Sequence, residues 1–138
     1  MPDEPNYKQA LAEYFSRKEE VLCVYLFGSQ AVGKQNAYSD VDIAVLYDES
    51  IPASEYTDGQ ISLSIDLSRL LGKNIDIIIL NKAAPYLKFQ IIQNGVRVYE
   101  KPARTDRTFE AHSIIEYFDF LPIKNLLESA MIKRIKEA

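Results

Sequence analysis

The sequence predicts an α/β (α+β) fold in which a small mixed β-sheet is flanked by helices. Short apolar, β-branched segments of strand length alternate with longer segments whose apolar residues recur at helical spacing. The chain has 138 residues, a length at which one domain can bury its own core. We therefore expect a single domain over residues 1–138, in which residues 101–138 form a C-terminal helical extension.

The first half of the chain is expected to contain two helices and two strands. Tyr7 to Ser16 carries apolar residues among polar ones in the pattern of a short amphipathic helix. Val21 to Phe27 is a continuous apolar run and therefore predicts a buried strand, with Asp40 to Tyr47 as the second strand. Ser54 through Leu71 shows helical spacing, and Gly72 provides the residue at which this helix ends.

The middle of the chain is expected to add two strands and a helix. Asn74 to Leu80 is β-branched and apolar except for one acid, a composition that predicts a central strand. A helix should begin after Pro85 and end near Asn94-Gly95. Val96 to Tyr99 then predicts an edge strand.

The last part of the chain predicts two helices, Ala103 to Phe120 and a second one opened by Pro122 and running to Lys136. The second helix carries an apolar stripe, formed by Ile123, Leu126, Leu127, Met131 and Ile135. Packing within the chain is the default interpretation of this stripe, and docking of a partner helix is the alternative.

One motif concerns chemistry rather than fold. It consists of Phe27-Gly28-Ser29 and, after ten intervening residues, Asp40-Val41-Asp42. Because strand side chains alternate in direction, Asp40 and Asp42 project to the same side, and two adjacent carboxylates repel each other unless a cation lies between them. Hard cations such as Mg²⁺ prefer carboxylate oxygens, and Asp76 on a neighbouring predicted strand is the candidate third acid.

This pattern resembles the hG[SG] and [DE]h[DE] motif of the nucleotidyltransferase superfamily that includes DNA polymerase beta. It is most similar to the minimal nucleotidyltransferases, the antitoxins paired with HEPN-domain toxins, over about residues 20 to 100. The resemblance implies a polymerase-beta-like fold, two Mg²⁺ ions bound by Asp40, Asp42 and Asp76, and a role for Asp76 in activating the acceptor hydroxyl.

The loop after the first strand is expected to bind the triphosphate of ATP. Gly28 lets the backbone approach the phosphates, and the Ser29 hydroxyl and neighbouring amides can donate to phosphate oxygens. The family often carries arginine in this loop, whereas this chain has Gln30 and Val32, so Lys34 is the candidate for the missing positive charge.

The resemblance implies transfer of AMP from ATP to a hydroxyl, that of a tyrosine on a cognate HEPN ribonuclease toxin, which is thereby neutralised within a hetero-oligomer. Two alternatives stay open. One is a binding-only antitoxin with a vestigial nucleotide site, which the residues Gln30 and Val32 favour. The other is nucleotidylation of a small molecule, which would need an acceptor pocket formed by dimerisation.

Three other patterns receive simpler interpretations. Gly28 to Lys34 matches the first part of a P-loop, but Gln35 stands where serine or threonine is required. Asp66 is a rival third acid that an ion pair with Arg69 would explain. The R-x-x-x-x-H spacing of Arg107 and His112 is that of HEPN ribonucleases, yet it aligns poorly on a helix and favours a solvated surface pair.

Composition limits the partners and the compartment. The net charge of -4 and the pI near 5.0 disfavour direct nucleic-acid binding. Cys23 is the single cysteine and lies in an apolar run, which predicts a buried side chain and a reducing compartment. Since no signal peptide or long apolar span is visible, we expect a cytoplasmic protein without membrane contact.

Overall fold

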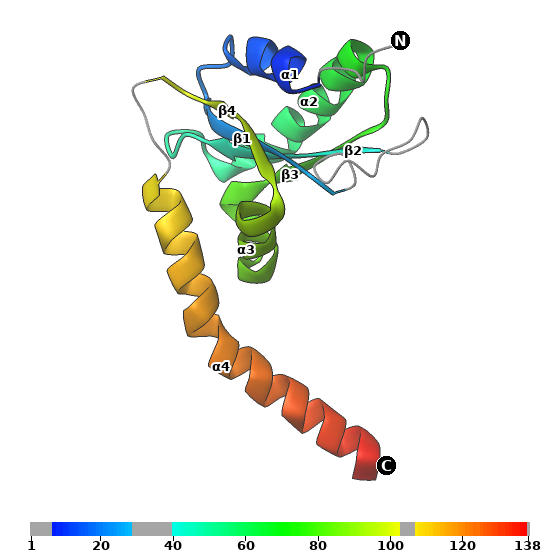
Figure 1. Cartoon of the computed structure of the whole chain (residues 1–138), viewed down its shortest axis with the longest axis vertical. Helices are drawn as coiled ribbons and strands as arrows, with labels where there is room; N and C mark the ends of the chain where they lie inside the picture. Colours follow the sequence, from blue (N-terminus) through cyan, green and yellow to red (C-terminus); the bar gives the residue numbers. More distant parts are fainter. Residues whose placement is uncertain (1–6, 29–39, 103–106, 138) are drawn as a thin grey trace.

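The computed structural model describes residues 7–28, 40–102 and 107–137. The elements follow one another in the order shown in Figure 1. They are α1 (Tyr7–Phe15), β1 (Val21–Phe27), β2 (Val41–Tyr47), the 3₁₀ turn η2 (Ala53–Glu55), α2 (Tyr56–Leu71), β3 (Ile75–Ile79), the 3₁₀ turn η3 (Leu80–Lys82), α3 (Pro85–Asn94), β4 (Val96–Glu100) and α4 (Arg107–Glu137). Apart from the C-terminal region, this order follows the predicted one.

The described strands form a mixed sheet in the order β3-β2-β1-β4. Strand β1 is antiparallel to both β2 and β4, whereas β2 and β3 run parallel. The predicted mixed sheet and the edge position of β4 are confirmed. The central position predicted for β3 is wrong, because β3 lies at the opposite edge. The strand is apolar because helices cover both faces of the sheet, although only one of its edges is paired with another strand.

One face of the sheet is covered by α1 and α2 (Figure 1). Leu11 and Phe15 of α1 and Leu67 of α2 are fully buried against alternate residues of the strands, such as Val41 and Ile43. Burial of one such side chain stabilises the fold by about 1.5–3 kcal/mol. This apolar layer is the larger of the two. Because it takes every second residue of β2, the side chains between them point to the opposite face of the sheet.

The other face packs against α3 and the beginning of α4. Cys23 is fully buried in this layer, as predicted. The Tyr25 hydroxyl donates to Glu110 Oε1 at 2.8 Å and accepts from Arg97 Nη2 at 2.8 Å, and Arg97 also forms an ion pair with Glu110. This polar cluster ties β1, β4 and α4 together.

Helix α4 is one continuous helix with Pro122 inside it, so the prediction of two helices is wrong. A proline lacks the N–H for one helical hydrogen bond, and the usual consequence is a bend of the kind that α4 shows part-way along (Figure 1). Before the proline, α4 packs on α3: Tyr117 stacks on Phe89 with ring centroids 4.1 Å apart, and Lys88 pairs with Glu116 at 2.6 Å.

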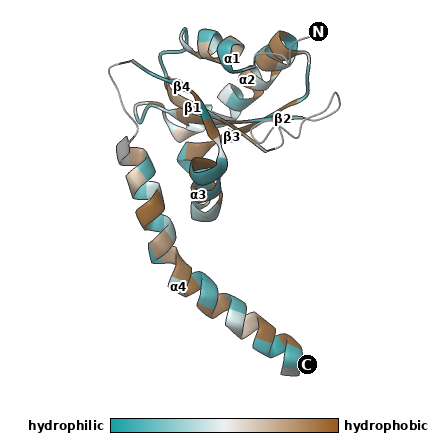
Figure 2. Cartoon of the chain, viewed as in Figure 1, coloured by the Kyte–Doolittle hydropathy of each residue, from teal (hydrophilic) through white to brown (hydrophobic). Residues whose placement is uncertain are grey.

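Beyond Lys124, α4 projects away from the sheet (Figures 1 and 2). Its apolar side chains there are between 54% and 71% exposed, namely Leu126, Leu127, Met131, Ile132 and Ile135. We call residues 125–137 the distal half of α4. Over the described residues, no helix has the length and apolar character needed to cross a bilayer.

Candidate active site

The parallel pairing of β2 and β3 places Asp42 directly opposite Asp76. Neighbouring residues in register point to the same side of a sheet, so both carboxylates lie on the face that α3 covers. The two strands are joined at this end by the Val41 amide, which donates to the carbonyl of Asn74 at 2.9 Å. Asp40 immediately precedes β2 and is exposed, whereas Asp42 is half-buried.

The charges of these acids act on one another. Burial raises the pKa of Asp42, and the nearby carboxylates of Asp76 and then Asp40 raise it further. Both causes disfavour the ionised form of Asp42. A cation bound at this edge of the sheet would remove the repulsion between the carboxylates.

The three acids do not, however, converge on one point. In the part of the chain that the structure describes, no group of three or more His, Cys, Asp and Glu side chains is arranged to hold a metal ion. The structure therefore brings Asp42 and Asp76 side by side, with Asp40 at the entrance to the same strand. The donor set fits Mg²⁺ in its chemistry, since these are carboxylate oxygens that repel each other while no cation lies between them.

Gly28 closes this site on the side of β1. Its φ of +73° is one that residues with a side chain rarely adopt, and a Cβ at this position would collide with the Asp42 carboxylate, only 3.1 Å from its Cγ. The glycine thus leaves room for the Asp42 carboxylate. Ser29 and Lys34 lie outside the described residues.

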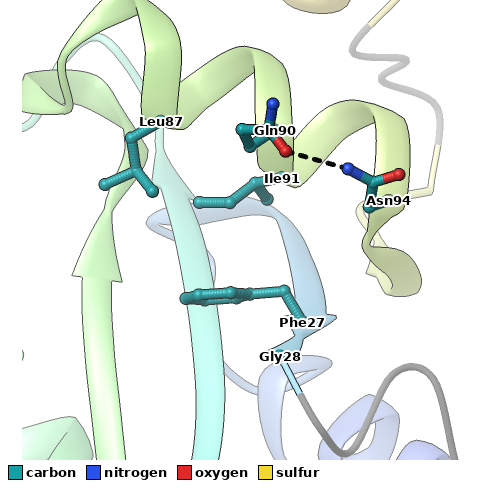
Figure 3. A pocket seen from close by; sticks show the side chains of 6 residues that line it. All are labelled: Phe27, Gly28, Leu87, Gln90, Ile91 and Asn94. Atoms are coloured by element: carbon teal, nitrogen blue, oxygen red, sulfur yellow. Dashed lines mark hydrogen bonds between the residues drawn. The ribbon is translucent and has the colours of Figure 1, made fainter.

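A cavity of about 360 Å³ opens next to Gly28, between the end of β1 and α3 (Figure 3). Its lining consists of Phe27, Gly28, Leu87, Gln90, Ile91 and Asn94. The α3 residues of this lining were not among the site residues predicted from the sequence. Their i, i+3, i+4, i+7 spacing, with two carboxamides on an otherwise apolar stripe, was the available signal.

Asp66, the rival third acid, and His112, of the R-x-x-x-x-H pattern, both lie outside this site. Asp66 is on α2, on the other side of the sheet, where its Oδ2 accepts a hydrogen bond of 2.8 Å from the Tyr14 hydroxyl. This contact replaces the predicted pairing with Arg69 as the explanation of Asp66. His112 is exposed on α4, as predicted for a surface residue, and the side chain of Arg107 is outside the described part.

The family model described as Polymerase beta, Nucleotidyltransferase matches residues 9–104. The chain belongs to the polymerase beta nucleotidyltransferase family. It is therefore a nucleotidyltransferase, as the glycine-serine and paired-acid motif indicated. The matched residues contain β1 to β4, and with them every acid of the candidate site.

Two relatives carry more specific names. The chain is 30% identical over 119 residues to the protein adenylyltransferase MntA of Aphanizomenon flos-aquae, covering 81% of this chain and 71% of MntA. It is 33% identical over 81 residues to a putative protein adenylyltransferase of Methanocaldococcus jannaschii, covering 59% of this chain and 83% of the relative. Both names describe enzymes of this nucleotidyltransferase family.

Solved structures share the fold. A chain of a toxin-antitoxin crystallised with AMP-PNP superposes with a TM-score of 0.73 at 23% identity, over 91% of this chain and 98% of that one. A chain from the complex of a tri-AMPylated Shewanella oneidensis HEPN toxin with its MNT antitoxin gives 0.65 at 21% identity, over 90% and 96%. These matches confirm the predicted polymerase-beta-like fold.

Proposed function

We propose that this nucleotidyltransferase is an antitoxin that transfers AMP from ATP to a tyrosine hydroxyl of a cognate HEPN ribonuclease toxin and so neutralises it. The observation that carries the proposal is the pairing of Asp42 with Asp76 beside Gly28 at one edge of the sheet. The names of the relatives, protein adenylyltransferases and a complex with an AMPylated HEPN toxin, support the acceptor class.

The reaction exchanges a phosphoanhydride bond of ATP for a phosphoester bond to the acceptor. The acceptor oxygen attacks the α-phosphorus of ATP, the bond from that phosphorus to the oxygen bridging to the β-phosphorus breaks, and pyrophosphate leaves. Asp76, the more exposed acid of the pair, accepts the proton of the attacking hydroxyl. Asp42 and Asp40 lie beside the position that the α-phosphate takes in the proposed site.

The proposed site takes Mg²⁺ with its nucleotide. When bound by Asp40, Asp42 and Asp76, the ion would neutralise the charge that develops on the phosphate oxygens. The raised pKa of Asp42 supports this assignment, because burial and then the neighbouring carboxylates of Asp76 and Asp40 disfavour its ionised form, and a bound cation would offset both effects. Removal of divalent ions with a chelator should therefore abolish transfer.

The remaining assignments concern the residues that bind the triphosphate, the class of partner and the cellular compartment. Gly28 and Ser29 contact the phosphates, and Lys34 supplies a positive charge in the same loop. The acidic net charge of -4 supports a protein partner rather than direct binding of nucleic acid, in the cytoplasm with the toxin.

The test is transfer of label from ATP labelled at the α-phosphate to the purified toxin, followed on denaturing gels. We expect Asp42→Asn and Asp76→Asn to lose at least about 100-fold in rate, since each removes a charge needed in the transition state. Asp58→Asn is the matched control, because Asp58 is an exposed acid on α2. Full transfer by Asp42→Asn would refute the mechanism, and label from the γ-phosphate would indicate a phosphotransferase.

A second candidate function is neutralisation by binding alone. The exposed apolar side chains in the distal half of α4 favour it, because a surface of this kind serves docking. The two functions separate in cells that express the toxin. Under the binding-only function Asp42→Asn still protects the cells, whereas under our proposal protection is lost with the transfer activity.

A further inference from the structure

We propose that the cavity between β1 and α3 binds the adenine base of the donor nucleotide, with Gln90 and Asn94 contacting the edge of the base. This inference rests on the proposed function, because AMP transfer is what brings a base to this edge of the sheet. It adds residues of α3, an element outside the glycine-serine and paired-acid motif, to the substrate site.

The position of the cavity fits a nucleotide held by the acids. Phe27 is the direct cross-strand partner of Asp42, and both side chains lie on the face that α3 covers. The strand order therefore places Asp76, Asp42 and Phe27 in a row, with adjacent strands about 4.8 Å apart. In the proposed arrangement the α-phosphate lies at Asp42, the acceptor lies on the β3 side and the base lies on the β1 side.

The walls of the cavity suit the faces of a flat ring. Phe27, Leu87 and Ile91 provide the apolar surface, and in Figure 3 the Phe27 ring lies across the opening from α3. Stacking on an aromatic ring is a favourable contact for a nucleic-acid base. Among the residues that the structure describes, the lining is apolar apart from the carboxamides of Gln90 and Asn94, a composition that suits a neutral base.

The polar edge of the cavity carries two carboxamides, which can both donate to and accept from a base. Asn94 Nδ2 donates to Gln90 Oε1 at 3.0 Å, one turn apart on α3, and this contact fixes the two carboxamides together. The Asn94 carbonyl oxygen and the Gln90 amide hydrogens take no part in this contact and can face a ligand. An acceptor beside a donor complements the amino group and ring nitrogen of adenine, the base that carboxamides usually bind.

The size agrees with this occupant. A volume of about 360 Å³ lies near the lower end of the range of about 300–1,000 Å³ for small-molecule sites. The cavity can hold a base and part of its ribose, while the triphosphate extends past Gly28.

The test compares binding of ATP with binding of inorganic tripolyphosphate to the full chain in the presence of Mg²⁺. Gln90→Leu and Asn94→Leu keep the side-chain size and remove the polar edge. We expect each to weaken ATP binding about tenfold, because each removes one of the two hydrogen bonds to the base and leaves the other group without its partner, with tripolyphosphate binding unchanged. In transfer assays, KM for ATP rises while kcat stays near the wild-type value.

Gln93→Leu is the matched control, because Gln93 is an exposed glutamine on the same helix outside the cavity lining. It should leave the binding of both ligands unchanged. Equal weakening of ATP and tripolyphosphate by Gln90→Leu would overturn the inference, since the residue would then act on the phosphates or on the fold.

Two further outcomes separate this inference from the proposed function. If both α3 variants bind ATP normally while Asp42→Asn still abolishes AMP transfer, the base site is wrong and the proposed function stands. A raised KM for the toxin with an unchanged KM for ATP would likewise overturn the base site, because it would give the cavity to the acceptor. If the wild type transfers no AMP but the variants selectively lose ATP binding, the base site stands.

Discussion

Among individual residues, Gly28 joins the fold to the site more directly than any acid does. It ends β1 in a left-handed conformation and leaves the space that the Asp42 carboxylate occupies. The sequence motif predicted a glycine for close approach of phosphate. The collision with Asp42 could not be predicted, because it depends on how β1 pairs with β2.

Gly28→Ala should therefore lose catalysis out of proportion to stability. The left-handed φ costs about 1 kcal/mol for alanine, and the new methyl group displaces the Asp42 carboxylate. We expect the rate of AMP transfer to fall at least about 100-fold, as it does when a catalytic group is misplaced by about 1 Å. Transfer rate and thermal unfolding should be measured together.

Gly72→Ala is the control for the loss of stability that comes from placing alanine in a left-handed backbone conformation. Gly72 has a φ of +65°, yet nothing lies within 4 Å of a Cβ added there. It should lose similar stability, about 1 kcal/mol, and keep full activity. Equal activity of the two alanine variants would show that the space beside Asp42 is not needed.

Among the elements, the helices and strands with clear apolar periodicity were predicted well. The bounds of β1 and α3 follow the sequence closely, because Gly28, Pro85 and Gly95 mark their ends. Two predictions failed because long-range packing overrides local signals. Pro122 is accommodated within α4, and an apolar strand such as β3 can lie at the edge of a sheet when helices cover it.

We expect the distal half of α4 to bind the toxin without supporting the fold. A chain that ends at Lys124 should keep its unfolding temperature within about 2 °C, since removal of exposed surface groups changes stability by under about 0.5 kcal/mol. It should also keep its affinity for ATP. Its affinity for the toxin should fall at least tenfold, as measured by calorimetry.

The matched control replaces three of the distal residues, Leu126, Met131 and Ile135, with serine in the full-length chain. Loss of toxin binding in this variant would assign the effect to the apolar side chains rather than to chain length. A truncated chain that unfolds well below the wild type would contradict the prediction, because the distal half would then support the fold.

For the whole molecule, the sequence allowed the fold class, the mixed sheet and the three acids to be predicted. Asp42 and Asp76 could be assigned to one site because each stands out as an acid within an apolar strand. The cavity could not be predicted in the same way. Phe27 and Asn94 are far apart in the chain, and only the packing of α3 on the sheet brings them together.

The larger apolar layer controls the stability of the whole chain. Leu67→Ala should lower the free energy of unfolding by about 2–5 kcal/mol, because Leu67 is fully buried between α2 and the sheet. Leu70→Ala is the control: Leu70 is 49% exposed on the same helix, so its loss should stay below about 1 kcal/mol. Urea titration of both variants measures the difference, and similar losses would contradict the assignment of the core.

The parallel pairing of β2 with β3 also separates the two strands in the sequence. Parallel neighbours cannot be joined by a tight turn, and α2 lies in the connection between β2 and β3. Contacts of this separation form late, after the cost of closing the intervening loop has been met. The acid pair therefore does not exist in a chain that has formed only its β1–β2 hairpin, and a newly made molecule becomes competent for catalysis only when β3 has paired with β2.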